Sequence, residues 1–224
     1  MDKKYYTDLI NKKPWQYISD HFDNLKKFTP TVITTLDVNP EDWIKFSVDY
    51  FDDAQQKSEY PKDHYSGFST KLAKTMNELG RNEHNSFELN YGVNGETNKI
   101  MCEMLGKENI KKMGLQEEYL LLRLIVQWPG NGVAWHMDDA GSYTRTYPEL
   151  KIDENKKCQL GQLVRYWFSP TDWENGHTFQ ISETMLWNYK KGEVFQIPFG
   201  MGHASANAGY TLKYSVALTG IRNV

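Results

Sequence analysis

The chain has 224 residues, of which 25% are charged, and its 26 Lys and Arg against 29 Asp and Glu give a formal net charge of −3. This length suits one domain with a substantial core. The charge balance lacks the basic excess of proteins that hold nucleic-acid phosphates, so nucleic acid is not a favoured partner. Two cysteines without a C-x-x-C spacing, and an amino terminus without an apolar signal segment, predict a cytoplasmic location. No stretch approaches the roughly 18 apolar residues of a membrane span.

The first half of the chain predicts one strand followed by helices. The β-branched run 31–36 alternates in polarity and predicts a strand. Asn39 before Pro40 is typical of a helix start, because asparagine caps the first turn and proline fits its first position. Apolar residues at helical spacing predict two further helices, over 69–80 and 96–105.

From residue 118 onward the pattern changes to closely spaced short strands. A near-continuous apolar run over 119–128 predicts one strand, and a Pro-Gly turn separates it from a second at 133–137. Further strands are expected at 163–168, 177–181, 185–189, 194–198 and 211–221. The polar segment 139–157 has no regular period and is expected to form a loop over an active-site mouth.

These patterns predict an α+β, mainly β protein, because strands without intervening helices favour a sandwich or jelly roll over a parallel α/β sheet. Residues 1–117 are expected to form a largely helical extension that packs on one sheet. Residues 118–224 are expected to form the β core, and the whole chain one compact unit.

His136 and Asp138 form an H-x-D pair at the end of the strand predicted at 133–137. Side chains two residues apart in a strand lie on the same side, so both can reach one ion. A second histidine, His203, follows in a glycine-rich stretch, 199–207, that we expect to be a turn. Two imidazoles and one carboxylate are the ligand set of non-haem Fe(II) oxygenases. The three residues therefore predict a catalytic metal site, with a hydrogen-bonded pair at the strand end as the alternative for the H-x-D.

The last predicted strand has two unlike faces. One face is apolar, and the other carries Thr211, Lys213, Ser215, Ala217 and Thr219. A lone buried ammonium is costly, so a long cation among small side chains predicts a cavity that holds an anion such as a dicarboxylate. The alternatives are that Lys213 is a solvated strand residue, or that Arg222 pairs with the anion instead.

His136-x-Asp138, His203 and Lys213 together resemble the 2-oxoglutarate/Fe(II)-dependent oxygenase superfamily, and the lysine after the distal histidine resembles its prolyl 4-hydroxylase-like branch. The likeness covers roughly residues 118–221. The resemblance implies a double-stranded β-helix core, that is, a cupin-like jelly roll. The N-terminal residues are not covered by it.

The resemblance further implies that His136, Asp138 and His203 bind Fe(II) and are catalytic. It implies a dioxygenase that uses O2 and the co-substrate 2-oxoglutarate to hydroxylate an unidentified small molecule or protein side chain, with succinate and CO2 as products. Related halogenases lack the carboxylate ligand, so Asp138 favours hydroxylation.

The same resemblance gives expected co-substrate contacts. Lys213 is expected to pair with the distal carboxylate of 2-oxoglutarate, as a point charge rather than a bidentate partner. Gln127 and Ser215 are expected to be further co-substrate contacts. Many relatives have a tyrosine in the strand where this chain has Gln127.

Other polar residues near these motifs have two possible roles each. Tyr143 and Arg145 are either substrate contacts or ordinary loop residues, and Arg165 is either a substrate contact or part of a structural ion pair. His177 is an alternative metal ligand. Asn207 is expected either to orient the loop of the distal histidine or to stabilise a turn.

A second function from another class is open. A cupin-like metal-binding module, or a non-oxidative metalloenzyme that does not use 2-oxoglutarate, would need the metal ligands but no anion partner. A nucleic-acid demethylase is opposed by the negative net charge. No motif discloses the primary substrate, the oligomeric state or the role of the N-terminal extension.

Overall fold

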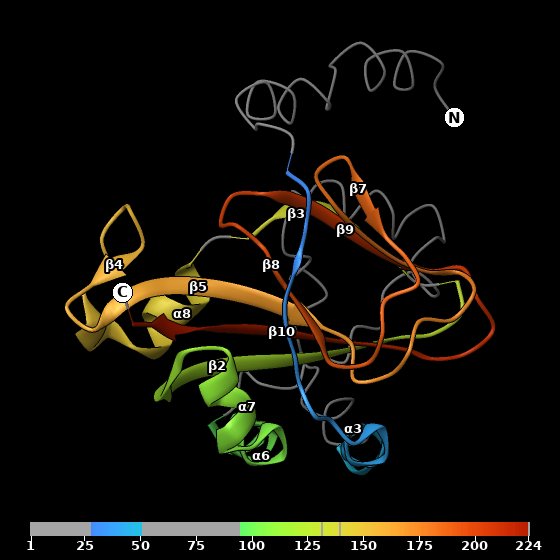
Figure 1. The fold of residues 1–224 in the computed structure, drawn as a ribbon, viewed down its shortest axis with the longest axis horizontal. Coiled ribbons are helices and arrows are strands. Elements are labelled where there is room, and N and C mark those ends of the chain that lie inside the picture. Colours follow the sequence, from blue (N-terminus) through green and yellow to red (C-terminus); the bar gives the residue numbers. More distant parts are fainter. Residues whose placement is uncertain (1–27, 51–94, 131, 139, 224) are drawn as a thin grey trace, which may run out of the picture.

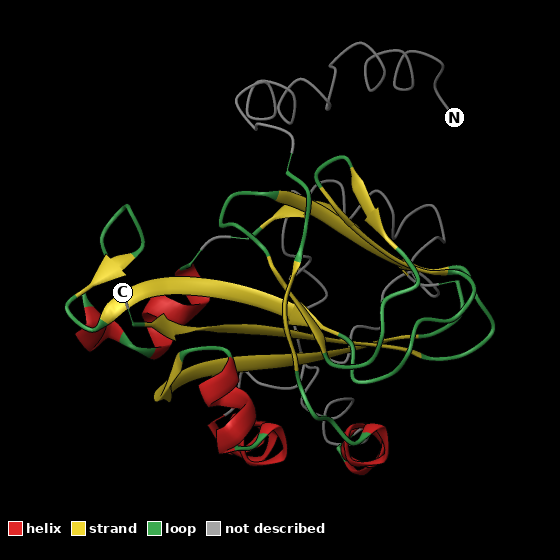
Figure 2. Ribbon diagram, in the orientation of Figure 1, coloured by secondary structure: helices red, strands yellow, loops and turns green. Residues whose placement is uncertain are grey.

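The computed structural model describes residues 28–50, 95–130, 132–138 and 140–223, with the backbone but not the side chains of residues 134–137. The helix expected over 69–80 lies outside these residues. The described chain forms two antiparallel β-sheets, with helices against the larger one (Figure 1, Figure 2).

The larger sheet, sheet A, has the strand order β1-β8-β5-β10-β2, and β4 pairs with β5. Its strands are β1 (Val32–Thr35), β2 (Leu115–Gln127), β4 (Lys157–Cys158), β5 (Gly161–Phe168), β8 (Glu193–Gln196) and β10 (Lys213–Arg222). The smaller sheet, sheet B, has the order β3-β9-β6-β7. Its strands are β3 (Gly132–Met137), β6 (His177–Ile181), β7 (Thr184–Leu186) and β9 (Gly202–Asn207).

From β2 to β10 the chain passes back and forth between the two sheets. It runs through β2 in sheet A, β3 in B, β4 and β5 in A, β6 and β7 in B, β8 in A, β9 in B and β10 in A. This alternate winding is a jelly roll, or double-stranded β-helix, so the predicted mainly β, α+β fold is confirmed. Strand β1 pairs with β8, so residues before 118 add a strand to sheet A; the division at residue 117 stays a prediction.

The helices α3 (Pro40–Asp49), α6 (Gly95–Leu105) and α7 (Lys107–Lys112) pack on the outer face of sheet A, as predicted (Figure 2). Trp43 of α3 meets Phe168 of β5 edge-on, with 5.8 Å between the ring centroids. The same cluster contains Phe46, Met101, Leu105, Ile110, Leu122, Leu124, Val216 and Leu218. No helix in the described ranges is long and apolar enough to cross a membrane.

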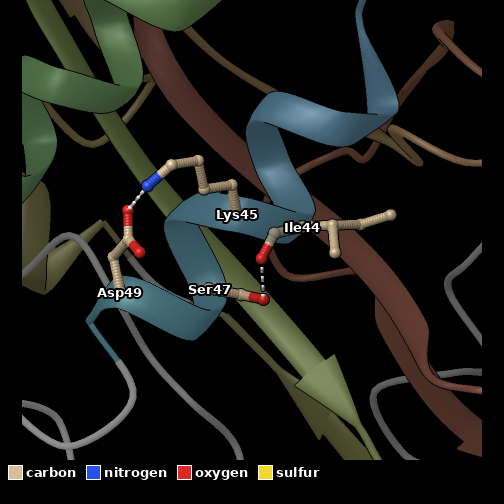
Figure 3. A network of polar contacts seen from close by, with 4 residues as sticks. All are labelled: Ile44, Lys45, Ser47 and Asp49. Carbon is tan, nitrogen blue, oxygen red and sulfur yellow. Dashed lines mark hydrogen bonds and ion pairs between the residues drawn. The ribbon is translucent and has the colours of Figure 1, made fainter.

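Helix α3 begins as the sequence predicts, because the side chain of Asn39 caps its first turn. Its surface carries an ion pair between Lys45 and Asp49, and the hydroxyl of Ser47 donates to the carbonyl oxygen of Ile44 at 2.7 Å (Figure 3). An exposed pair at this spacing contributes only about 0.3–0.5 kcal/mol. The buried face therefore holds this helix in place.

An aromatic core lies between the two sheets. The ring of Trp167 in β5 stacks on that of Phe179 in β6, with centroids 4.6 Å apart and planes 6° from parallel. Stacked aromatic pairs contribute about 0.5–1.5 kcal/mol beyond the burial of their area. Ile181, Leu186, Tyr189, Phe195, Ile197 and Met201 complete the cluster.

The segment 139–157 is not the open loop that we expected. It contains α8 (Gly141–Thr146), the 3-10 helix η1 (Pro148–Leu150) and the first residue of β4. Buried Tyr143 and Leu150 pack with the sheet A residues Leu121, Leu163 and Ile221. These few apolar anchors fold the segment onto the core, and its high average polarity conceals them.

Replacing Trp43 with alanine tests the packing of helices on sheet A. Trp43 is 1% exposed, so W43A should lower the free energy of unfolding by about 3–5 kcal/mol. Val48 on the same helix is 66% exposed, and V48A should change it by at most about 0.5 kcal/mol. Chemical denaturation measures both, and equal losses would contradict the packing described here.

Candidate metal centre

Two of the three predicted metal ligands lie on neighbouring strands. In the antiparallel pairing of β3 with β9, His136 is directly opposite His203, and such partners have Cα atoms about 4.5–5.5 Å apart. The expectation that His203 lies in a turn is wrong. The turn ends where the N–H of Met201 donates to the carbonyl oxygen of Pro198, and the next residues pair with strands on both sides, which overrides the local glycine signal.

Asp138 follows β3 directly and contacts His203. Its Oδ2 atom is 2.9 Å from Nε2 of His203. Nδ1 of the same ring is 3.0 Å from the carbonyl oxygen of Met201, which only accepts, so we assign the ring proton to Nδ1. In a neutral ring with the proton on Nδ1, the lone pair of Nε2 faces this carboxylate oxygen. Two acceptors this close repel each other unless a proton or a metal cation lies between them.

The geometry of this pair fits ligation of one cation. Two ligand atoms that are each about 2.0–2.2 Å from a first-row metal, at roughly a right angle, are about 3 Å apart. The 2.9 Å between Nε2 of His203 and Oδ2 of Asp138 matches this separation. A hydrogen bond from the second ring nitrogen to a backbone carbonyl also commonly orients metal-binding histidines. These donor atoms therefore fit a divalent first-row metal ion.

The side chain of His136 lies outside the described residues. Among the side chains that the structure describes, no group of three or more His, Cys, Asp or Glu is placed to hold an ion. The described part of the centre thus supplies one imidazole and one carboxylate. Only the backbone register brings His136 to it, and the complete ligand set stays a prediction.

Arg165 reaches from β5 in sheet A to the carboxylate of Asp138. Its Nη2 atom is 2.5 Å from Oδ2, the oxygen that also faces His203. The side chains of Arg165 and Asp138 are 10% and 21% exposed, so the pair is largely shielded from water. Removing one partner of such a pair is costly, because the other charge stays shielded. The structural ion pair expected for Arg165 is present, while a substrate contact stays a prediction.

Lys213 is fully buried, at 0% exposure, which excludes the solvated strand lysine. It is opposite Gln127 in the pairing of β10 with β2. Its ammonium donates to Oε1 of Gln127 at 2.8 Å and to Oγ of Ser205 in β9. Ser205 in turn donates to the same Oε1 at 2.7 Å. This network joins sheet A to sheet B, and its member Ser205 was not predicted because the strand β9 was not.

Two polar groups near Lys213 are buried without a described partner. Gln127 is 1% exposed and Ser215 is 3% exposed. Nε2 of Gln127 and Oγ of Ser215 hydrogen-bond to none of the residues that the structure describes. Leaving a buried donor unsatisfied costs about 1–3 kcal/mol. A carboxylate bound here would accept hydrogen bonds from both groups, and it would match the charge of Lys213.

Of the two roles expected for Asn207, the structure supports the stabilisation of a turn. Its Nδ2 atom donates to the carbonyl oxygens of Gln127 and Thr211, at 2.8 and 2.7 Å, and its Oδ1 accepts from the N–H of Gly209 at 3.0 Å. These bonds fix the chain just before β10. Asn207 therefore determines where Lys213 enters the sheet.

His177 is placed away from the Asp138–His203 pair. In the pairing of β6 with β9, His177 is opposite Asn207, while Ile181 is opposite His203. Its Nε2 atom is 3.4 Å from the carbonyl oxygen of Thr211. This placement does not support His177 as a substitute metal ligand.

The other predicted substrate contacts lie in α8. Tyr143 is 2% exposed and its hydroxyl donates to the carbonyl oxygen of Tyr119 at 2.8 Å; burial raises the pKa of this hydroxyl. Arg145 is largely exposed, and its Nη2 donates to Oγ of Ser142 at 3.3 Å. Packing and a local hydrogen bond account for these placements. Substrate binding by either residue stays a prediction.

The far end of β10 does not provide a second anion partner. Arg222 donates to the hydroxyl of Tyr166 at 3.3 Å, and Tyr166 belongs to the core under the helices. Arg222 thus lies on the face opposite to Lys213, and the alternative that assigns it the anion is wrong.

A cavity of about 450 Å³ near this end of β10 is lined by residues 157–161 and Asn223. None of the predicted site residues lines it.

Comparisons with known proteins add little to this geometry. No protein-family model matches the chain, and no curated protein matches it. Solved structures with a similar course include a predicted oxalate decarboxylase from Thermotoga maritima (14% identity, 50% of this chain and 73% of that one, TM-score 0.31) and a cupin domain from Bordetella pertussis Tohama I (14% identity, 46% and 81%, TM-score 0.29). A cupin 2 conserved barrel domain protein from Salinispora arenicola is 13% identical over 45% of this chain and 62% of that one, with a TM-score of 0.29. Likeness at this level carries no argument about function, so the fold rests on the strand order itself.

Burial makes His177 a source of pH-dependent stability. Desolvation has the largest effect and lowers the pKa of His177; the hydrogen bond with Thr211 opposes it in part, Lys213 lowers the pKa further and Glu174 raises it least. Above a pH of about 6.5 the ring is neutral in the folded and unfolded chains. Below this pH the unfolded chain binds a proton that the folded chain does not, so the free energy of unfolding falls until the pH reaches the lower folded-state pKa.

The variant H177Q should therefore show a smaller loss of stability between about pH 6.5 and the acid limit of folding than the unmodified protein. Urea denaturation at a series of pH values measures the slope. Only the slopes are compared, because the loss of the contact with Thr211 lowers the stability of H177Q at every pH. Identical slopes would show that protonation of His177 does not oppose folding.

Proposed function

We propose that the protein is an Fe(II)- and 2-oxoglutarate-dependent dioxygenase that hydroxylates a small molecule or a protein side chain, with 2-oxoglutarate converted to succinate and CO2. The observation that carries this proposal is the contact between Nε2 of His203 and Oδ2 of Asp138, at 2.9 Å. When the ring is neutral both atoms are acceptors, and we infer that a divalent metal cation between them offsets their repulsion. We infer that His136 is the third ligand, which is supported by its backbone position opposite His203.

The interior around Lys213 supports a dicarboxylate co-substrate. Its buried ammonium would bind the distal carboxylate, and Nε2 of Gln127 would donate a second hydrogen bond in place of the tyrosine hydroxyl of many relatives. Ser215 offers its hydroxyl on the same strand face as Lys213. Burial strengthens each of these interactions because water does not compete for the donors.

Bound Fe(II) would supply the activation of O2, coupled to decarboxylation of 2-oxoglutarate. The residues of the chain would bind and orient the metal ion. His203 is oriented by the carbonyl oxygen of Met201, and Asp138 would supply the carboxylate of the ligand set. Ala217 and Thr219 follow Ser215 on the same face of β10, next to Trp167 and Arg165 of β5.

A second candidate is a metal-binding jelly-roll protein or non-oxidative metalloenzyme that does not use 2-oxoglutarate. The observation that favours it is that the ammonium of Lys213 already has partners within the protein, in Gln127 and Ser205. In this reading the lysine network joins the two sheets and binds no co-substrate. Affinity for 2-oxoglutarate decides between the two candidates.

The first test is turnover of 2-oxoglutarate to succinate with added Fe(II), ascorbate and O2, followed by mass spectrometry without a primary substrate. The protein should form succinate slowly, and H203A should reduce the rate at least about 100-fold, since loss of a ligand removes the metal. V48A, changed on the exposed face of α3, is the control. Undiminished turnover by H203A would contradict the metal assignment, and metal binding without turnover would select the second candidate.

The second test is the affinity for 2-oxoglutarate, measured by calorimetry with Mn(II) and no O2. K213M keeps the length of the side chain but removes its charge, so the Kd for 2-oxoglutarate should rise about 10- to 100-fold, equivalent to one charge-assisted hydrogen bond. K191M, at an exposed lysine, should leave the Kd unchanged. Equal affinity of K213M and the unmodified protein would remove Lys213 from the co-substrate site.

A further inference from the structure

The alternation of β5 places Arg165 between the two sheets. Val164 and Tyr166 pack under the helices, whereas Trp167 packs against sheet B. Arg165 shares the face of Trp167, because side chains alternate along a strand. Its neighbour across the pairing with β10 is Thr219, a small residue over which a long side chain can extend. The guanidinium therefore crosses the interior from sheet A to the end of β3.

At the end of β3, Arg165 meets the carboxylate oxygen that faces His203. Oδ2 of Asp138 is 2.5 Å from Nη2 of Arg165 and 2.9 Å from Nε2 of His203. The terminal torsion of an aspartate is broad, so without a fixed contact either oxygen can turn toward the histidine. A guanidinium held between two sheets removes this freedom.

We propose that Arg165 is a positioning residue of the metal centre, which holds Oδ2 of Asp138 toward Nε2 of His203 so that both ligands are set for one divalent cation. This inference rests on the metal centre of the proposed function, but not on the use of 2-oxoglutarate. A buried ion pair is weak evidence for a contribution to stability. Positioning of a metal ligand gives the pair between Arg165 and Asp138 another role.

Arg165 has two opposite effects on a metal ion. Its positive charge repels the cation and weakens binding, whereas its hold on Asp138 orients a ligand and strengthens binding. A partner that orients a ligand typically changes metal affinity by about 10- to 100-fold when it is removed. The sign of the change therefore shows which effect dominates, and positioning predicts weaker binding in the absence of Arg165.

The experiment uses Co(II) alone as the probe, with the full chain and no co-substrate. R165M should raise the Kd for Co(II) about 10- to 100-fold and change the visible absorption spectrum of the bound ion. R165K keeps a charge but not the planar guanidinium, so it should lose less affinity. R123M is the matched control, since Arg123 also lies in sheet A, opposite Ala217, and should leave the Kd and the spectrum unchanged.

A double-mutant cycle with D138A shows whether Arg165 acts through Asp138. If it does, R165M should not raise the Kd for Co(II) in the D138A background, because the residue to be positioned is gone and only the repulsion by the guanidinium is removed. Additive effects of the two substitutions would overturn the proposal. A purely structural role would lower the thermal stability of R165M without this dependence on Asp138.

The outcomes separate the two proposals. Failure of the unmodified protein to bind Co(II) would overturn the metal centre itself. Binding by the unmodified protein with equal or tighter binding by R165M would leave the centre in place and overturn the positioning role. If circular dichroism shows that R165M does not fold, R165K decides by the same criterion, and equal or tighter binding by R165K overturns the proposal.

Discussion

The pairing of β3 with β9 determines whether a metal centre can form in this fold. It sets His136 opposite His203, and it delivers Asp138 to the same point because this residue follows β3 directly. A slip by one residue would turn every side chain of a strand to its other face. Strand β9 is protected against such a slip, because it is paired on both sides, with β3 and with β6.

The two faces of sheet A divide structural and chemical roles. The outer face is apolar and packs on the helices, while the inner face carries Lys213, Arg165 and Gln127. Charged groups in this position are costly unless each has a partner. Besides Gln127 of the same sheet, partners come from the opposite sheet, with Ser205 for the lysine and the carboxylate of Asp138 beside β3 for the arginine. The polar residues therefore connect the sheets where the aromatic cluster around Trp167 does not.

Much of the fold was predictable from the sequence, because its signals are local and repeated. The helix capped by Asn39, the buried strand β2 and the alternation of β10 were all found as expected. The segment after the H-x-D was not, since its helix α8 is too short for a periodic signal. The strand β9 was missed because its small residues and glycines favour turns, whereas its pairing with two distant strands decides its structure.

Individual residues of the site were predictable from the sequence, whereas the contacts between them were not. The burial of Lys213 followed from the pattern of its own strand. Its contact with Ser205 and the contact of Arg165 with Asp138 join residues of different sheets, so no local pattern encodes them. Arg222 was a wrong alternative because it lies on the other face of β10 from Lys213, where it contacts Tyr166.

The winding of the chain between two sheets also has a kinetic consequence. The strands that carry the centre pair across long stretches of sequence, as in the partnership of Gln127 with Lys213. Topologies dominated by such distant contacts fold slowly, on the order of milliseconds to seconds, because large loops must close first. His203 and Asp138 meet only when β3 pairs with β9, which closes another long stretch of sequence. Since β2 and β10 also form the surface on which the helices pack, the helical layer and the Asp138–His203 contact both depend on such long-range closures.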